Sequence, residues 1–342
     1  DLPREAGLGQ HHCGKLNEAL MKRSQGYDII GDIHGCALTL ERLLEQMGYR
    51  QRQGVYEHPS RMAVFLGDII DRGPRIREAL HLVRDMVDRG SALIVMGNHE
   101  YNALGYCTLA RPGSGRRHVR EHNERHNRLI RATLEQFEHY DDEWHDFLNW
   151  FYELPLFLER DGFRVVHACW DEHLIRQFEH RHPDACINED FLHASMAPHS
   201  FAGRVMDRLL RGTAMKLPDD RVMTGRDGFQ RQFFRTKFWA EQAETYGDIV
   251  FQPDPLPEDV ANRPLDPEDR ERLLSYDRNE PPVFVGHYWL EGVPEPITPN
   301  VACLDYSAVK YGRMVAYRLD DEETLDPDRF VWVEVNRSEQ GP

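Results

Sequence analysis

Three apolar runs near the start of the chain each lead into a short phrase rich in glycine and polar residues. The runs are Asp28–Ile30, Met62–Leu66 and Ala92–Met96, and the phrases are Gly31–Gly35, Gly67–Gly73 and Gly97–Glu100. Apolar runs of this length that end at a glycine are typical of buried strands running into tight loops. The pattern therefore predicts neighbouring strands with Asp, His, Asn and Arg side chains at their ends.

Apolar residues at helical spacing follow the first two phrases, over residues 37–44 and 76–83. Strands that alternate with helices favour parallel pairing and right-handed crossovers, so we expect an α/β fold. A polar helical stretch is expected over residues 111–150. Further strands are expected at residues 163–166, 283–285, 301–304, 314–317 and 330–333.

The chain is expected to form one main domain with additions. Residues 1–26 are predicted to be a polar N-terminal arm, and residues 27–342 are within the size range of one domain with insertions. Regular patterning is weakest over approximately residues 171–280, where charges are dense and prolines gather between 253 and 267. We interpret this stretch as an inserted, cap-like region.

The charge of the chain limits its partners. The formal net charge is −16 over 342 residues, which argues against a general nucleic-acid or anionic-membrane binder because such surfaces demand clustered Lys and Arg. A small anionic substrate stays possible, since a local metal cluster reverses the sign of the field around it. The sequence does not indicate an oligomeric state.

The six cysteines have no close-pair spacing, which favours a reducing compartment over a disulfide scaffold. No apolar run approaches the roughly 18 residues that a spanning helix needs, so no membrane partner is expected. A cytoplasmic location is the prediction. Because the first residue is Asp1 and not Met, a signal peptide that has been removed stays an open alternative.

Oxygen and imidazole donors in these phrases indicate a metal site. Asp32 and His34 are separated by one residue and can face one cation, and a second carboxylate, Asp68, can bridge two cations. One neutral oxygen donor and two imidazoles that follow later strands would complete a second site: Asn98, His167 and His287. This donor mixture suits Mn²⁺, Fe or Zn²⁺ better than Ca²⁺, and two Mn²⁺ ions are the expected cofactors.

The phrases also contain candidates for acid catalysis and phosphate binding. His99 follows the candidate ligand Asn98 and would face a leaving-group oxygen as a general acid, with Asp71 holding its tautomer. Arg72 offers a planar fork for two phosphoryl oxygens. Together with two cations that activate a water, these groups make a complete phosphoryl hydrolase.

The combination resembles the phosphoprotein-phosphatase type of calcineurin-like metallophosphoesterase, in its bacterial branch. That family carries GDxHG, GDxxDRG and GNHE and then two later metal histidines, and the first three are matched in full here. The resemblance is specific over residues 28–101, moderate around 163–170 and 283–305, and absent from most of 171–280. It implies an αββα sandwich, a dinuclear metal centre and phosphoester hydrolysis. By the same resemblance, one metal is held by Asp32, His34 and Asp68, the other by Asp68, Asn98, His167 and His287, and the leaving group is protonated by His99 with Asp71.

Two departures from the family pattern concern the residues expected to bind phosphate. Cys169-Trp170 stands where a glycine usually follows the first late histidine, and the only arginine close behind it is Arg176. Two further groups of positively charged side chains each have two interpretations. The arginines at 116, 117, 120, 125 and 128 fit a solvated helix face better than a phosphate-recruiting wall. Arg226, Arg231, Arg235 and Lys237 could lean over the metals or belong to a packed cap.

The leading functional hypothesis is a phosphomonoesterase acting on phosphoproteins or small phosphoesters. The same centre would support hydrolysis of a dinucleoside polyphosphate of the diadenosine tetraphosphate type, or of a nucleic-acid phosphodiester, so the motifs do not separate these reactions. A metal-bound scaffold without turnover is the remote alternative. It is disfavoured because every candidate ligand and the His99/Asp71 pair are present.

Overall fold

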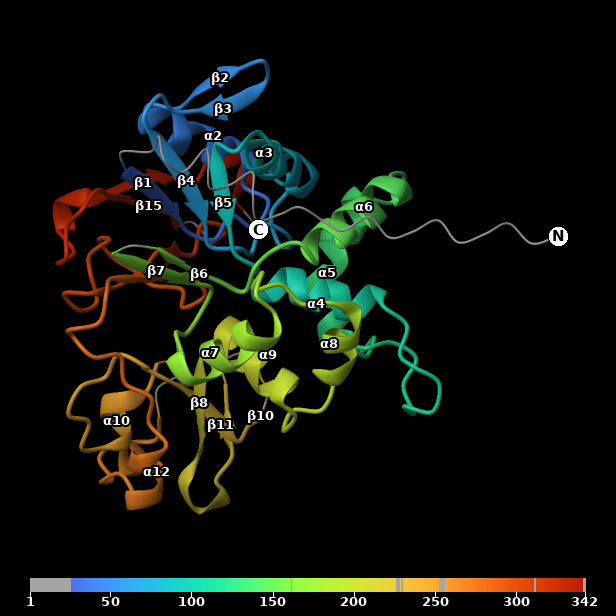
Figure 1. Cartoon of the computed structure of the whole chain (residues 1–342). Coiled ribbons are helices and arrows are strands. Elements are labelled where there is room, and N and C mark those ends of the chain that lie inside the picture. The colour runs from blue at the N-terminus through green and yellow to red at the C-terminus, as the bar shows by residue number, and fades with distance from the viewer. Residues whose placement is uncertain are drawn as a thin grey trace.

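The computed structural model describes residues 26–160, 162–225, 228, 230–251, 256–310 and 312–340. Of the predicted N-terminal arm, residues 1–25 lie outside these ranges, as do Arg226 and part of the proline-rich segment. Two β-sheets form the centre of the molecule, and helices cover them on both outer sides (Figure 1).

The first sheet has six strands in the order β14-β15-β1-β4-β5, with β16 paired to β15. The strands are β1 (Gly26–Ile30), β4 (Arg61–Phe65), β5 (Ala92–Ile94), β14 (Asp305–Tyr306), β15 (Arg313–Leu319) and β16 (Phe330–Glu334). β1, β4 and β5 are parallel neighbours, as the alternation of strands and helices predicts. The C-terminal β15 is antiparallel to β1.

The second sheet has the order β13-β12-β7-β6. Its strands are β6 (Phe157–Arg160), β7 (Phe163–Val166), β12 (Val283–Val285) and β13 (Val301–Cys303). β7, β12 and β13 run parallel, while β6 returns antiparallel to β7. Segments more than a hundred residues apart in the chain therefore end at the same edge of one sheet.

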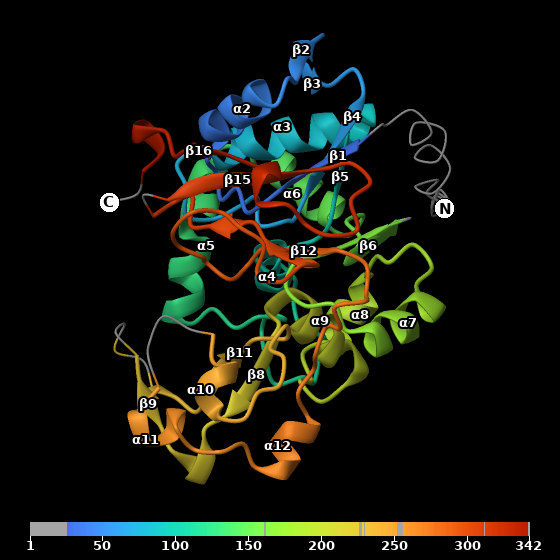
Figure 2. The ribbon, with the colours of Figure 1, turned by 90° about the vertical axis from the view of Figure 1, so that its left-hand side faces the viewer.

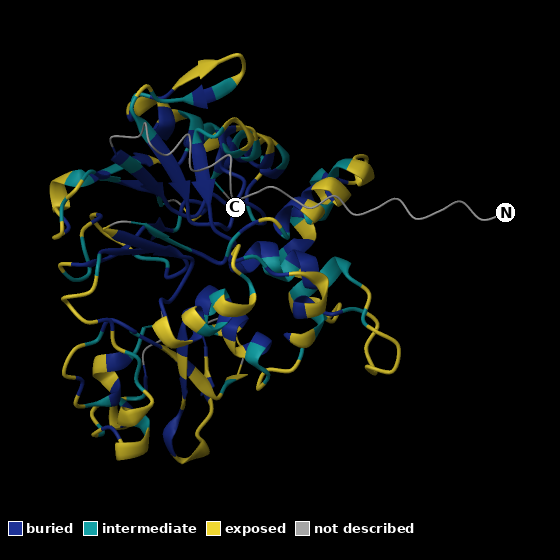
Figure 3. Cartoon of the chain, viewed as in Figure 1, coloured by how far each residue is buried: buried dark blue, intermediate teal, exposed yellow. Residues whose placement is uncertain are grey.

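The two sheets pack face to face through an apolar layer. Val64 and Leu93 of the first sheet and Val165 and Phe284 of the second are buried in one cluster. Burial of such side chains is the main favourable term in folding, at about 25 cal/mol per Å² of apolar surface. The sheets and the layer between them form the dark interior of Figure 3.

Helices make the outer layers. They are α2 (Ala37–Gln46), α3 (Ile76–Arg89), α4 (Asn98–Cys107), α5 (Glu124–Gln136), α6 (Asp141–Phe151), α7 (Glu172–Arg181), α8 (Glu189–Ala194) and α9 (Phe201–Arg211). Figure 1 places α2 and α3 over the first sheet and α7 and α9 beyond the second. The predicted αββα sandwich is thus the observed fold. A short hairpin, β2 (Arg50–Arg52) and β3 (Val55–Glu57), follows α2.

The helical stretch expected over residues 111–150 differs in its first part. Residues 108–123 form a loop, and helix begins only at Glu124. Pro112, Gly113 and Gly115 explain the difference, because these residues disfavour helix interiors by about 1 to 3 kcal/mol each. The helical stretch expected from residue 111 therefore begins later than predicted, at Glu124.

The stretch interpreted as an insertion at 171–280 has two structurally different parts. Its first part supplies α7, α8 and α9, whose apolar side chains join the main core. Its second part is a small lobe with its own apolar cluster, which includes Phe234, Tyr246 and Ile249. The lobe contains β8 (Thr213–Lys216) paired with β11 (Phe233–Thr236), β9 (Met223–Thr224) paired with β10 (Gln230–Arg231), and the short helices α10 (Tyr246–Ile249), α11 (Glu258–Ala261) and α12 (Pro267–Glu271).

Candidate active site

The residues singled out by the sequence gather where strands of both sheets end. Each follows a strand directly or begins the next helix: Asp32 and His34 after β1, Asp68, Asp71 and Arg72 after β4, Asn98 and His99 at the start of α4, His167 after β7, and His287 after β12. All but Arg72 are buried. In open α/β sheets the carboxyl ends of parallel strands are where ligands bind.

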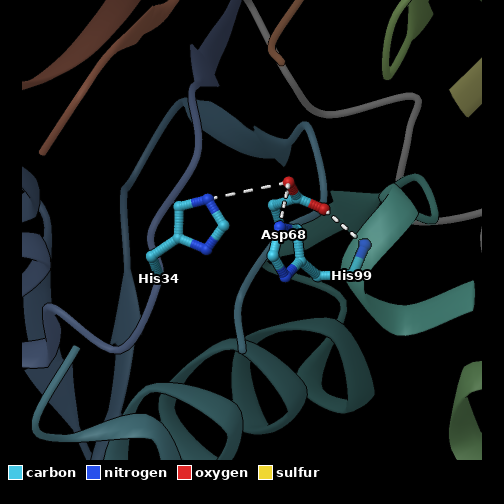
Figure 4. Close-up of side chains that lie close together, drawn as sticks. All are labelled: His34, Asp68 and His99. Atoms are coloured by element: carbon cyan, nitrogen blue, oxygen red, sulfur yellow. Dashed lines mark hydrogen bonds and ion pairs between the residues drawn. The ribbon is translucent and has the colours of Figure 1, made fainter. Parts of the chain in front are cut away.

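Asp68 and His34 form the first group of possible ligands (Figure 4). Nε2 of His34 lies 3.6 Å from Oδ2 of Asp68 and 3.9 Å from Oδ2 of Asp32. The Nδ1 atom of His34 donates to the backbone carbonyl of Ile70 at 2.8 Å, which assigns the proton to Nδ1 and leaves a lone pair on Nε2. Nε2 is buried and has no hydrogen-bond partner among the described residues.

The second group surrounds Asn98. Its Oδ1 lies 3.0 Å from Nε2 of His167 and 2.8 Å from Nδ1 of His287. Nε2 of His167 is also 3.4 Å from Oδ2 of Asp68. The same carboxylate oxygen therefore lies between the two groups. Asp68 belongs to two groups of side chains whose donor atoms lie within 4.8 Å of one another. One group also contains His34 and His99, and the other contains His167 and His287.

The three candidate imidazole ligands differ in their electrostatics. Burial alone would lower the pKa of His167, but attraction to Asp68 outweighs it and raises that pKa to about 10, whereas the pKa values of the other two are lowered. Burial, followed by the charges of Arg72 and His99, holds the pKa of His34 well below its usual value. Burial and the charge of Arg235 do the same to His287. Both imidazoles are therefore neutral, which is the form that binds metal.

The carboxylates crowd one another. Burial and the neighbouring Asp305 raise the pKa of Asp32 well above its usual value. Burial alone would raise the pKa of Asp68 too, but attraction from His167 and His99 outweighs it and lowers that pKa. Buried carboxylates this close together are stabilised by cations, and the donor set of carboxylate, amide and imidazole suits Mn²⁺, Fe or Zn²⁺. The residues present thus fit a pair of divalent ions.

A carboxylate binds the ring nitrogen of His99 that points away from the candidate ligands. Its Nδ1 lies 2.5 Å from Oδ2 of Asp71, and Asp71 accepts through Oδ1 from the hydroxyl of Thr133. Nε2 of His99 faces the site, 3.9 Å from Oδ2 of Asp68 and 3.3 Å from an Nη atom of Arg72. The Arg72 guanidinium also lies over the ring of Trp289, 4.2 Å from its centroid.

The loops that carry these side chains are strained and tightly braced. Six of the non-glycine residues with positive φ belong to them: His34, Asp68, Asp71, Arg72, His287 and Trp289. Such backbone persists only where the surroundings enforce it. Glu100 supplies much of that support, because its buried carboxylate accepts from the backbone amides of Gly97, Asp68 and Ile69 at 2.8–3.0 Å.

Glycine is required where two of these loops meet. Gly67 has a φ of +86°, and a Cβ on it would lie 2.3 Å from the backbone nitrogen of Gly97. No side chain fits that gap. The glycines of the second and third phrases therefore allow the Asp68 and Asn98 loops to touch.

Several residues of the site were not singled out by the sequence. Asp305 is buried and accepts from the backbone amides of Trp289 and Ser307. Glu100 binds backbone amides and Thr133 binds Asp71. Neither role has a sequence pattern like that of a metal ligand or a catalytic acid. Glu100 does end the third phrase, which is the one signal that could have marked it.

The structure shows where the two departures from the family pattern lie. Cys169 and Trp170 are buried, and burial raises the pKa of the Cys169 thiol. Arg176 lies on α7, where its guanidinium bonds Glu172 and Glu159 at 2.7 and 2.6 Å and is occupied away from the candidate ligands. Arg235 of β11 is a cation of the lobe, and its charge reaches His287.

Comparison with known proteins fits this geometry. Residues 27–217 match the model of the calcineurin-like phosphoesterases, which is more than half of the chain. The chain belongs to that family. Membership confirms the resemblance drawn from the three phrases, and the family's enzyme class is that of metal-dependent phosphoester hydrolases. Among the described residues of this phosphoesterase, no helix has the length and apolar character needed to cross a membrane.

Curated relatives share chiefly the motif region. The phosphoesterase is 46% identical over 74 residues to a bis(5'-nucleosyl)-tetraphosphatase PrpE [asymmetrical] of Halalkalibacterium halodurans, covering 21% of this chain and 30% of the relative. It is 34% identical over 158 residues to the protein of the same name from Oceanobacillus iheyensis, covering 45% of this chain and 60% of the relative. The matches thus span less than two thirds of these relatives.

Two solved structures are also similar. A protein serine/threonine phosphatase of Saccharomyces cerevisiae has a TM-score of 0.48 at 15% identity, over 92% of this chain and 81% of that chain. A cold-active protein-tyrosine phosphatase of a Shewanella species has a TM-score of 0.43 at 15% identity, with the same coverage. Neither likeness bears on the substrate.

Proposed function

We propose that this protein hydrolyses phosphoester bonds with a dinuclear metal centre. One cation would be held by Asp32, His34 and Asp68, and the other by Asp68, Asn98, His167 and His287; Mn²⁺ is the expected ion. The observation that carries the proposal is the position of Asp68. Its Oδ2 lies 3.6 Å from Nε2 of His34 and 3.4 Å from Nε2 of His167, so one carboxylate serves two ligand sets.

The remaining residues supply binding and proton transfer. The cations, when bound, supply Lewis acidity and an activated water. Arg72 can turn its planar fork from His99 to two phosphoryl oxygens, which is the geometry that arginine binds best. His99 then gives a proton from Nε2 to the leaving-group oxygen as the P–O bond to that oxygen breaks and the bond from the water oxygen forms.

Asp71 acts on His99 and not on the substrate. Its carboxylate accepts from Nδ1 of His99, which stabilises the protonated imidazole that acid catalysis requires. Thr133 holds the other carboxylate oxygen and so fixes the direction of this bond. The ordered pair is also the reason to prefer an enzyme over a scaffold that only binds metal.

Two substrate classes remain in competition. Phosphomonoester hydrolysis, on a phosphoprotein or a small phosphoester, needs only the groups above. Hydrolysis of a dinucleoside tetraphosphate is favoured by the names of the relatives that share up to 46% identity over the motif region. The net charge of −16 disfavours a long nucleic acid as substrate.

The experiment is turnover by protein reconstituted with Mn²⁺. Para-nitrophenyl phosphate, its bis-ester, a phosphopeptide and diadenosine tetraphosphate are tested in parallel, with the same protein after chelation as the matched control. We expect Mn²⁺-stimulated hydrolysis of para-nitrophenyl phosphate. Folded, metal-loaded protein that hydrolyses none of the four would overturn the proposal.

A further inference from the structure

A small basic cavity lies along α4, the helix that begins with Asn98 and His99. It has a volume of about 180 Å³, and α4, the loop at 108–123 and the end of α9 contribute its walls. Its charged and strongly polar lining comes from Asn102, Arg116, Arg120, Glu121, His126 and Arg211. Three arginines and one histidine thus share this cavity with one glutamate, in a chain whose net charge is strongly negative. Figures 1 and 2 both place α4 close to α9.

Arg120 is the central cation of this cavity. Its side chain is half-buried, and burial together with the charge of Arg211 lowers its pKa to about 10. Within the described ranges its guanidinium has no carboxylate partner. By contrast, Arg211 donates to Oδ1 of Asn102 at 2.8 Å, and Arg116 lies 3.7 Å from Glu121. Even a half-buried cation is costly without a counter-charge, so this position favours an anionic ligand.

The loop that carries Arg120 is fixed to α4. The backbone amide of Arg120 donates to the carbonyl of Gly105 at 2.8 Å, and that of Val119 to Thr108 at 3.0 Å. A Cβ at Gly105 would lie 3.2 Å from Cβ of Arg120, so the loop packs closely because this residue is glycine. The backbone of Arg120 is therefore held in place, which lowers the part of the entropic cost of binding that comes from ordering the loop.

The cavity lies on the side of the proton donor. Asn102 follows His99 by three residues on α4, which places it about one helical turn, or 5 Å, further along the same face. The charge of Asp71, the partner of His99, also reaches Arg120. A group that leaves with the proton from His99 would thus depart next to the basic cavity.

We propose that the cavity binds a phosphate carried by the leaving group. The inference rests on the proposed phosphoester hydrolysis and adds a substrate class to it. Arginine forks bind phosphate oxygens with charge-assisted, often paired hydrogen bonds. A leaving group with its own phosphates, such as a nucleoside polyphosphate, meets this requirement. The neutral side chain of a phosphoprotein does not.

The test compares two substrates in two variants. Arg120→Gln removes the central charge, and Arg117→Gln removes an exposed charge from the same loop as a matched control. We expect Arg120→Gln to lower the ratio of kcat/KM for diadenosine tetraphosphate to that for para-nitrophenyl phosphate by about 10- to 100-fold, mainly through KM. Arg120→Lys should restore part of the ratio, and Arg117→Gln should leave it unchanged. Melting curves of all variants report on folding.

The possible outcomes distinguish a failure of this inference from a failure of the proposed function on which it rests. If the wild-type protein cleaves para-nitrophenyl phosphate but not diadenosine tetraphosphate, or if Arg120→Gln leaves the ratio unchanged, the cavity is not a leaving-group site and only the proposed function survives. If the metal-loaded wild type cleaves neither substrate, the proposed function fails first and the inference falls with it.

Discussion

Nδ1 of His99 lies 2.5 Å from Oδ2 of Asp71. The contact leaves only Nε2 of His99 to face the candidate metal ligands, where it is 3.9 Å from Oδ2 of Asp68. His99 thus has one ring nitrogen bound to Asp71 and the other directed toward the candidate ligands. Under the proposed mechanism, proton transfer and metal binding are carried out by neighbouring residues of one short segment.

Replacing His99 by Asn tests its role as the acid. We expect His99→Asn to keep its metal content while turnover of para-nitrophenyl phosphate falls by about 10²- to 10⁴-fold, the usual contribution of a general acid. Elemental analysis and steady-state kinetics on the same sample check both parts. Unchanged turnover would remove His99 from the mechanism.

Asp71 should act through His99 alone. Asp71→Asn is expected to lower kcat by about 10- to 100-fold, because the protonated imidazole loses its counter-charge. The same substitution made in a His99→Asn background should cost little more, since residues that act as one unit are not additive. A double variant whose loss equals the product of the two single losses contradicts this assignment.

Glu100 should stabilise the loops of the site. Glu100→Gln keeps the size of the side chain but turns an amide group toward the backbone N–H donors of Gly97, Asp68 and Ile69. We expect the free energy of unfolding to fall by about 1–3 kcal/mol, the cost of buried unsatisfied groups. Urea denaturation measures it, and a variant as stable as the wild type would show that the amides need no carboxylate.

The C-terminal segment should stabilise α2 in the same way. Cys36 offers this helix no side-chain cap, and the buried Glu339 instead accepts from the backbone amides of Leu38 and Thr39 at 2.8 and 2.9 Å. Glu339→Ala is expected to cost about 1–2 kcal/mol by urea denaturation, as for loss of a helix cap. Ser338→Ala, at an exposed neighbour, serves as the control. Equal stability of the two variants contradicts the capping role.

Much of the site could be predicted from strand ends. Asp32, His34, Asp68 and Asn98 each follow an apolar run closely, and parallel strands bring such positions to one edge. His167 could be chosen for the same reason, although it belongs to the other sheet. What links all these positions is local patterning, which sequence carries directly.

The remainder depends on contacts that leave no periodic signal. Glu100 and Asp305 bind backbone amides, and a carboxylate with that role looks like any other acidic residue in a sequence. Arg120 looked like part of a solvated helix, but Pro112 and the glycines near it make a loop that folds back onto Gly105. The lobe after α9 depends on pairing of β8 with β11 across an intervening hairpin, which the patterning of either strand alone does not specify.

The most direct test of the dinuclear centre is a titration of Mn²⁺ into chelated protein, with bound metal and para-nitrophenyl phosphate turnover measured on the same samples. Asp68 shared between two ligand sets predicts that activity rises with the second equivalent bound, and that His287→Ala stops near one equivalent with little turnover. Full turnover at one equivalent, or in chelated protein, would contradict the account.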